Sequence, residues 1–174
     1  MTLLTLNPRQ KVQLQEAVKD MRIAGLLLEL FEHLPKEEHT DLITEQFNTR
    51  TAMQILNDGY ATGCTDFAIC YCAFLRYLNI SYEYIEVLEK RWLESPIDDK
   101  KVMGHAFVKV GDLLIDPQRK IIYQDPAFVL RRYEVFGEGK EPYDLGLTSF
   151  RTNMRKYLEF KEKYQLSKKT TDRA

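Results

Sequence analysis

The stretch "GCTDFAICYC", residues 63–72, holds all three cysteines of the chain within nine positions, so its folding decides what the thiols can do. Zinc sites usually pair cysteines two to four residues apart and add a second pair of Cys or His. Here the spacing is C-x5-C-x-C and the nearest histidines in sequence are His39 and His105, which argues against structural zinc. On a helix, Cys70 and Cys72 point to different sides, which argues against a disulfide between them. The favoured interpretation is one nucleophilic cysteine with two packing neighbours.

The composition is typical of a globular protein. With 174 residues, 44% of them hydrophobic and 29% charged, the chain suits one soluble domain with a sizeable core. A formal net charge of −1 offers no basic field for nucleic acid and no polybasic stretch for an anionic membrane. No apolar run approaches the roughly 20 residues of a transmembrane helix, and the first 15 residues lack signal-peptide features. We therefore expect a cytoplasmic protein with reduced thiols.

The first half of the chain is expected to be mainly helical. Apolar residues at three- and four-residue spacing predict helices over residues 8–34, 40–57 and 64–78, with stops at Pro35, Gly59 and Asn79. The stretch "ISYEYIEVL", residues 80–88, is rich in β-branched and aromatic side chains and predicts a strand. Residues 89–103 are expected to form an exposed loop.

The second half reads as a small sheet followed by a helix. "HAFVKV" (105–110) and "LLID" (113–116) alternate around Gly111-Asp112, which predicts a hairpin, and "IIYQ" (121–124) predicts a further short strand. The segment with Gly137, Gly139 and Pro142 is expected to be a loop, residues 149–166 a helix, and residues 167–174 a frayed end. This order predicts a single α+β domain. Its expected parts are a helical region (1–60), a core (61–125), and a C-terminal loop and helix (126–174).

Cys64 differs from the other two cysteines by its position. It follows Gly63 at the junction of a loop and a helix, where the first backbone N–H groups have no partner within the helix. The positive end of the helix dipole favours a thiolate there, and the free N–H of Cys64 can point at a developing oxyanion. Cys70 and Cys72 lie deeper in the apolar helix and are expected to behave as small hydrophobic residues.

A nucleophilic cysteine needs a base and a group that orients it. His33 and His39 flank "LPKEE", a predicted surface turn, and are interpreted as solvated residues. His105 opens a strand after Gly104, which allows a backbone or a ligand to approach closely. If Gly111-Asp112 is a two-residue turn, Asp116 lies diagonally from His105 on the same face of the hairpin. A three-residue turn would send Asp116 to the opposite face.

The same residues carry a family resemblance. "GCTDFAICYCAFLRYLNISYEYIEVL" (63–88) and "GHAFVKVGDLLIDP" (104–117) resemble the transglutaminase-like superfamily, and "EPYDLGLTSF" (141–150) is similar to a tail of its small prokaryotic members. The resemblance implies a papain-like α+β fold in which the cysteine helix packs on an antiparallel sheet. It implies that Cys64 is the nucleophile, His105 the base and then the acid, and Asp116 the residue that orients it.

Two features depart from the family pattern. Phe107 stands where many members have Trp, and no motif marks the side chain that completes the oxyanion hole. Tyr60 and Gln54 are candidates for that side chain. Gly63 and Gly104 complete the set of oxyanion or substrate candidates.

Together these features predict a cysteine-dependent acyl-transfer enzyme that hydrolyses amide bonds of a protein or peptide substrate with a Cys64–His105–Asp116 triad. No metal, other cofactor, nucleic acid or membrane is expected to take part. One alternative is transglutaminase-type amine transfer at the same site. Others are a non-catalytic protein-binding module with the same fold and a zinc-binding regulator.

Overall fold

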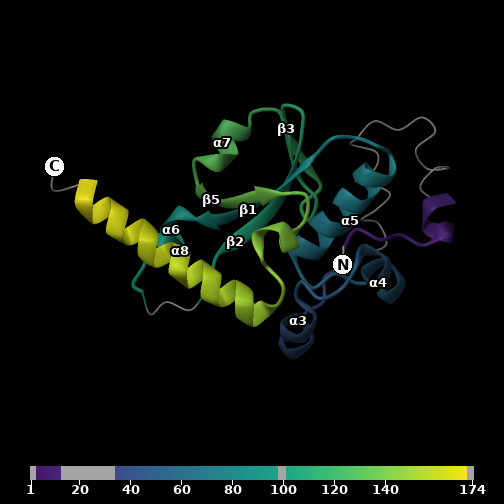
Figure 1. Cartoon of the computed structure of the whole chain (residues 1–174), viewed down its shortest axis with the longest axis horizontal. Coiled ribbons are helices and arrows are strands. Elements are labelled where there is room, and N and C mark those ends of the chain that lie inside the picture. The colour runs from purple at the N-terminus through teal and green to yellow at the C-terminus, as the bar shows by residue number, and fades with distance from the viewer. Residues whose placement is uncertain (1–2, 13–33, 98–100, 172–174) are drawn as a thin grey trace.

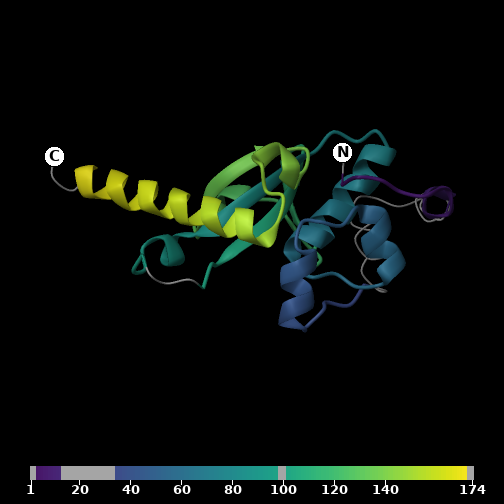
Figure 2. The same cartoon turned by 60° about the horizontal axis from the view of Figure 1, so that its bottom comes forward.

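A computed structural model describes residues 3–12, 34–97 and 101–171 (Figures 1 and 2). It confirms the α+β class: helices flank a five-stranded antiparallel sheet with strand order β4-β3-β2-β1-β5. The strands are β1 (Glu83–Glu89), β2 (Gly104–Val110), β3 (Leu113–Asp116), β4 (Ile121–Tyr123) and β5 (Tyr133–Gly139). The helices are α3 (Thr40–Gln46), α4 (Ala52–Asp58), α5 (Cys64–Tyr77), α6 (Lys90–Leu93), α7 (Pro126–Leu130), the 3-10 helix η1 (Pro142–Leu145) and α8 (Phe150–Thr171).

The central helix α5 confirms the helix predicted over residues 64–78. Every side chain from Thr65 to Leu75 is buried, so the helix is covered on all sides rather than along one stripe. One side packs on the sheet, where Tyr84, Ala106 and Ile115 join its hydrophobic cluster. Burial of this kind supplies most of the stability of a helix, and it fixes the direction in which the first turn of α5 points.

The β2–β3 hairpin has the predicted two-residue turn. Val110 pairs with Leu113 and Val108 with Ile115, so Gly111 and Asp112 alone connect the strands. Gly111 has a φ of 58°, a left-handed conformation that costs a glycine little and most other residues more. The further short strand predicted at residues 121–124 is present as β4 and pairs with β3.

The prediction of one long helix over residues 40–57 is wrong, because the chain forms two short helices there. Asn48 adopts a left-handed conformation with a φ of 57° and ends the first of them. Thr51 then begins α4 in a capping box: its side chain accepts a hydrogen bond from the Gln54 N–H, and the Gln54 side chain accepts one from the Thr51 N–H. Local capping therefore overrides the helical spacing. Gly59, with a φ of 76°, ends α4 as predicted.

The prediction of an exposed loop over residues 89–103 is partly wrong. Its first residues form α6, whose Trp92 is 1% exposed in a cluster with Tyr157 of α8. A buried tryptophan holds this turn in a helical form even though the sequence around it is charged. The same cluster joins the end of β1 to α8.

The prediction of a loop around Gly137, Gly139 and Pro142 is also wrong. Residues 133–139 form β5, which pairs with β1, and the glycines are needed for packing. A Cβ at Gly137 would lie 2.9 Å from Leu145 Cδ2, and one at Gly139 would lie 2.8 Å from Asp144 Cβ, so η1 can rest on the strand only where side chains are missing.

The ends of the chain were predicted only in part. Helix α8 confirms the closing helix but continues to Thr171, past the expected frayed end at residue 167. It runs beside the sheet and extends beyond it, so the last turns of α8 lie at the opposite end of the molecule from α3, α4 and α5 (Figures 1 and 2). Of the helix predicted at residues 8–34, residues 8–12 are helical and 13–33 lie outside the described residues. Among the described helices, none combines the length and apolar character needed to span a membrane.

Candidate active site

Cys64 is the first residue of α5 and is partly buried. Gly63 caps the helix with extended backbone, and its carbonyl accepts a hydrogen bond from Phe67 N–H at 3.5 Å. Because Cys64 is in the first turn, its own N–H has no acceptor within the helix. The structure therefore places a thiol and a backbone donor with no acceptor inside the helix together at the positive end of a 14-residue helix.

A buried ion pair fixes the loop that leads to Cys64. Arg50 donates to Asp66 Oδ2 at 2.6 Å, and the two side chains are 6% and 1% exposed. The same carboxylate oxygen accepts from the N–H and the hydroxyl of Thr62, both at 2.8 Å. Asp66, in the first turn of α5, is thus hydrogen-bonded to Thr62 and holds the loop that leads into the helix. No local sequence pattern predicts this network, because Arg50 and Asp66 belong to different elements.

His105 and Asp116 form the predicted hydrogen bond. The Nε2 atom of His105 lies 2.8 Å from Asp116 Oδ2, and the residues are 5% and 0% exposed. The second carboxylate oxygen of Asp116 accepts a hydrogen bond from the Arg119 N–H at 3.0 Å, so each oxygen of the carboxylate has a hydrogen-bond partner. With Nε2 taken by Asp116, Nδ1 is the ring nitrogen left for Cys64. The prediction that a two-residue turn brings Asp116 to the same face of the hairpin as His105 is confirmed.

The surroundings of His105 favour its protonated form. Burial alone would lower the pKa, but the hydrogen bond with Asp116 and the neighbouring Cys64 side chain outweigh it and raise the pKa of His105 to about 10. Phe107, two residues along β2, packs edge-on against the imidazole with 4.7 Å between ring centroids. An imidazolium held between Asp116 and a thiol is the arrangement that stabilises a thiolate.

Gln54 and Tyr60, the predicted oxyanion candidates, have other partners. The Gln54 side chain is exposed and belongs to the capping box of α4. The Tyr60 hydroxyl donates to Gln46 Oε1 at 2.9 Å, and the Arg50 guanidinium lies 4.6 Å from the centre of the tyrosine ring. Among the described residues, no hydrogen bond joins either side chain to Cys64 or His105.

Of the two glycine candidates, only Gly104 is crowded. A Cβ at Gly63 would make an ordinary contact at 3.9 Å with Phe47. A Cβ at Gly104 would lie 3.1 Å from the carbonyl oxygen of Val87 and 3.2 Å from Leu88 Cδ2. The close approach expected before His105 is therefore made by the backbone of β1.

Cys70 and Cys72 are both fully buried in α5, as expected for packing residues. Burial raises the pKa of both thiols, so neither has the environment of a reactive cysteine. The side chain of His39 is 86% exposed, in agreement with its interpretation as a solvated residue, and His33 lies outside the described residues. Within the described ranges no group of three or more His, Cys, Asp or Glu side chains is arranged to hold a metal ion.

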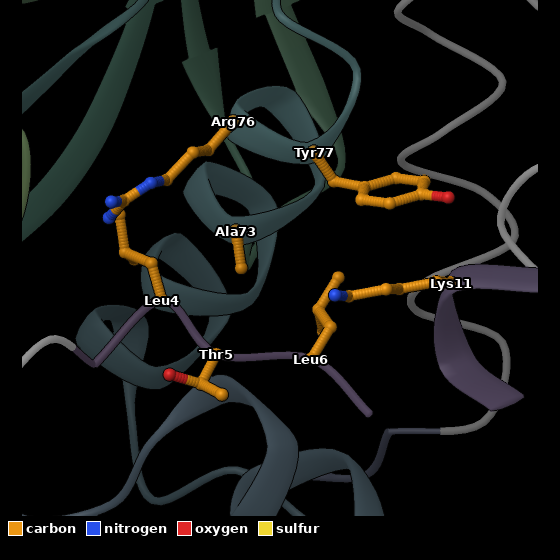
Figure 3. Close-up of a pocket in the computed structure, with 7 residues that line it drawn as sticks. All are labelled: Leu4, Thr5, Leu6, Lys11, Ala73, Arg76 and Tyr77. Carbon is orange, nitrogen blue, oxygen red and sulfur yellow. The ribbon is translucent and has the colours of Figure 1, made fainter. Parts of the chain in front are cut away.

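A separate cavity of about 250 Å³ lies on the outer side of α5 (Figure 3). Ala73, Arg76 and Tyr77 form one wall, and Leu4 to Leu6 with Lys11 form the other. At 1.5 Å per helical residue, Ala73 is about 14 Å along the helix from Cys64. This cavity is therefore not part of the Cys64–His105 site.

Comparisons with known proteins agree with this fold. No protein-family model and no curated protein matches the sequence. The structure is similar to the crystal structure of a candidate cysteine protease from Cytophaga hutchinsonii, with a TM-score of 0.53 and 13% sequence identity. The match covers 82% of this chain and 47% of the other, so this chain spans about half the length of that protein. At such low identity the likeness shows the fold alone, and that fold is cysteine-protease-like.

Proposed function

We propose that this chain is a cysteine-dependent enzyme that hydrolyses amide bonds in proteins or peptides. The observation that carries the proposal is the buried His105–Asp116 pair, joined at 2.8 Å, next to a cysteine at the start of a long helix. The cysteine-protease-like fold supports it. The finer assignment to the transglutaminase-like superfamily rests on the sequence motifs alone and is part of the proposal.

In the proposed reaction, the Cys64 thiolate attacks the amide carbonyl carbon and forms a C–S bond. The Cys64 N–H donates to the oxyanion of the tetrahedral intermediate. The His105 imidazolium then gives its proton to the departing nitrogen as the C–N bond breaks, which leaves a thioester and a free amine. Neutral His105 next takes a proton from water, the hydroxide attacks the thioester, and the carboxylic acid leaves as Cys64 is regenerated. Asp116 keeps the imidazole oriented throughout.

Two alternatives differ from this in a measurable way. Transglutaminase activity uses the same thioester, but a substrate amine attacks it in place of water. A protein-binding module with this fold would leave the cysteine chemically idle. The alternatives can therefore be told apart by the product formed.

The test incubates a peptide library with the full chain, with and without a primary amine that carries an affinity tag, and identifies products by mass spectrometry. Cys64→Ala is the inactive control, and Cys72→Ala is the matched control for loss of a thiol in the same helix. We expect cleaved peptides with the parent chain and with Cys72→Ala, and none with Cys64→Ala. Tagged peptides would identify amine transfer instead. Identical product patterns for all three proteins would contradict an enzymatic role.

A further inference from the structure

Arg119 lies in the turn between β3 and β4, and the proposed reaction gives it no role. Asp116, the last residue of β3, pairs with Ile121, the first residue of β4, so residues 117–120 connect the two strands. Asp116 Oδ1 accepts a hydrogen bond from the Arg119 N–H at 3.0 Å, and this is a common way for an aspartate side chain to close a turn. The residue that orients His105 therefore also fixes the backbone of Arg119.

The side chain of Arg119 turns back to the same carboxylate. Its Nη1 atom lies 3.6 Å from Asp116 Oδ2, the oxygen that lies 2.8 Å from His105 Nε2. The guanidinium and the imidazole are therefore no farther apart than these two distances added together. The side chain of Asp116 is 0% exposed and that of Arg119 is 52% exposed, so one of the two partners of this buried oxygen reaches the solvent.

An aromatic cluster surrounds this contact on the same face of the sheet. Tyr133 of β5 and Tyr123 of β4 both interact with the guanidinium. Their rings pack edge-on against Phe107, with 5.7 and 6.4 Å between ring centroids, and Phe107 packs in turn against the imidazole of His105. Tyr133 is 5% exposed, so its hydroxyl group needs a partner within the protein, and the guanidinium provides one.

The other ionisable groups near the pair come from α5 and β1. Cys64 of α5 interacts with His105 directly. Glu86 of β1 pairs with the residue after His105, so its side chain lies on the other face of the sheet, where two tyrosine hydroxyl groups donate to it. Within the described ranges, Arg119 is the only Lys or Arg side chain that forms an ion pair with Asp116.

We infer that Arg119 is a positioning residue of the active site: its guanidinium binds the Asp116 oxygen that orients His105, and so limits how strongly the carboxylate keeps the imidazole protonated. A cation beside the carboxylate offsets part of its charge and repels an imidazolium. The proposed reaction needs this effect after the thioester has formed, because His105 must then be neutral to take a proton from water. The catalytic meaning of the inference rests on the proposed function, whereas the electrostatic contact can be measured without a substrate.

The test follows the protonation of His105 by NMR in full chains that carry Cys64→Ala, which leaves residue 64 uncharged as the thioester does. The imidazole carbon Cε1 is labelled and assigned through His105→Gln. Arg119→Gln removes the guanidinium and keeps the backbone N–H that closes the turn. Lys120→Gln is the matched control, because it removes a positive charge from the next residue of the same turn, which is also exposed.

We expect Arg119→Gln to raise the midpoint of the His105 titration by about 0.5–1 pH unit. Lys120→Gln should change it by less than about 0.2 pH unit, since an exposed charge without a contact to the pair is screened. Arg119→Lys keeps the positive charge and should bring the midpoint back toward that of the chain with Arg119. An unchanged or lower midpoint in Arg119→Gln, or an equal rise in Lys120→Gln, would overturn the inference.

A measurement without a change at residue 119 covers the case in which Arg119→Gln does not fold. Salt screens a half-exposed guanidinium far more than it screens the buried His105–Asp116 pair. The formal net charge of the chain is only −1, so little general effect of salt is expected. About 1 M NaCl should therefore raise the His105 midpoint in the Cys64→Ala chain. A midpoint that falls or stays in place would overturn the inference in that case.

The pH dependence of deacylation gives a second readout, which a merely structural role of Arg119 would not shift. An activated peptide ester acylates Cys64 with loss of its alcohol, and the rate at which water then cleaves the thioester is measured against pH. We expect the rise of this rate with pH to move to higher pH in Arg119→Gln, to stay in place in Lys120→Gln, and to return toward the parent profile in Arg119→Lys.

The outcomes separate this inference from the proposed function. A deacylation profile that Arg119→Gln leaves in place would count against the inference even if the chain cleaves amides. A chain that forms no thioester and cleaves no amide, but shows the expected NMR shifts, would contradict the proposed function and leave the electrostatic role of Arg119 standing.

Discussion

At the scale of single residues, position in the fold distinguishes three chemically identical thiols. Cys64 lies at the start of α5 next to His105, while Cys70 and Cys72 lie in its fully buried middle. Desolvation raises the pKa of the two buried thiols, whereas Cys64 lies beside the protonated imidazole of His105. Reactivity should therefore follow the fold and not the residue type.

This difference predicts selective labelling. At mildly acidic pH, iodoacetamide should modify Cys64 well before the other two cysteines of the folded chain, and peptide mapping by mass spectrometry would show where the label lies. In denaturant the three thiols should react alike, which is the control. Equal labelling of all three in the folded protein would rule out Cys64 as an activated nucleophile.

Removing the Cys64 thiol should affect activity and not stability. Cys64→Ala is expected to abolish turnover while it keeps most of the free energy of unfolding, since the side chain is only partly buried. Leu75→Ala, on the same helix but fully buried, should cost about 2–5 kcal/mol. Urea denaturation of both variants measures the contrast. An unfolded Cys64→Ala chain would indicate a structural cysteine.

The role of Asp116 can be tested by removing its charge. Asp116→Asn keeps the shape of the side chain but favours the wrong tautomer of His105, and the corresponding change in a serine protease lowers turnover about 10⁴-fold. We expect a loss of this order in kcat, together with a lower His105 pKa by NMR. Retention of full activity would show that the hydrogen bond is only structural.

At the scale of elements, the Arg50–Asp66 ion pair ties the first turn of α5 to the residues before α4. Arg50 binds two carboxylates that differ in exposure: the Asp66 side chain is 1% exposed and the Asp58 side chain 40%. Breaking a buried pair leaves an uncompensated charge, whereas an exposed pair is screened by water. The two carboxylates thus form a matched pair for mutation.

We expect Asp66→Asn to lower the free energy of unfolding by about 3–5 kcal/mol. Asp58→Asn should change it by less than about 1 kcal/mol. Chemical denaturation of both variants gives the comparison directly. Because Asp66 also accepts from Thr62, its loss should slow alkylation of Cys64 in the protein that remains folded. Equal effects of the two substitutions would mean that the loop is fixed by other contacts.

At the scale of the whole molecule, the site makes stability depend on pH. In the folded chain the pKa of His105 is raised to about 10, and an unfolded histidine titrates near 6.5. The folded state therefore binds this proton more tightly. Its contribution is fully present below about pH 6.5 and is lost as the pH rises through about 10.

The predicted consequence is a fall in the free energy of unfolding between about pH 6.5 and 10, at up to about 1.4 kcal/mol per pH unit. Urea titrations at pH 7, 8 and 9 measure this slope, and His105→Gln provides the reference without the titrating group. The slope should be smaller in the variant. Parallel curves for the two proteins would show that His105 is not held as an imidazolium.

Sequence alone was sufficient for the features that depend on local rules. The apolar run after Gly63 predicts α5 and places Cys64 at its start, because helix ends and burial can be read from neighbouring residues. The two-residue turn at Gly111 fixes the register of the hairpin, and the two-residue period of strands then brings Asp116 to His105.

Only the tertiary structure decided the features that depend on distant partners. Glu86 and Tyr157 lie 71 residues apart, and no local pattern links a strand glutamate to a tyrosine on the last helix. The segment that became β5 contains glycines that predict a loop, but pairing with β1 and packing under η1 outweigh that preference. In the fold, backbone and charged groups find hydrogen-bond partners on segments that are far away in sequence. Neighbouring residues carry no information about those partners, so the surroundings of the site could be known only from the tertiary structure.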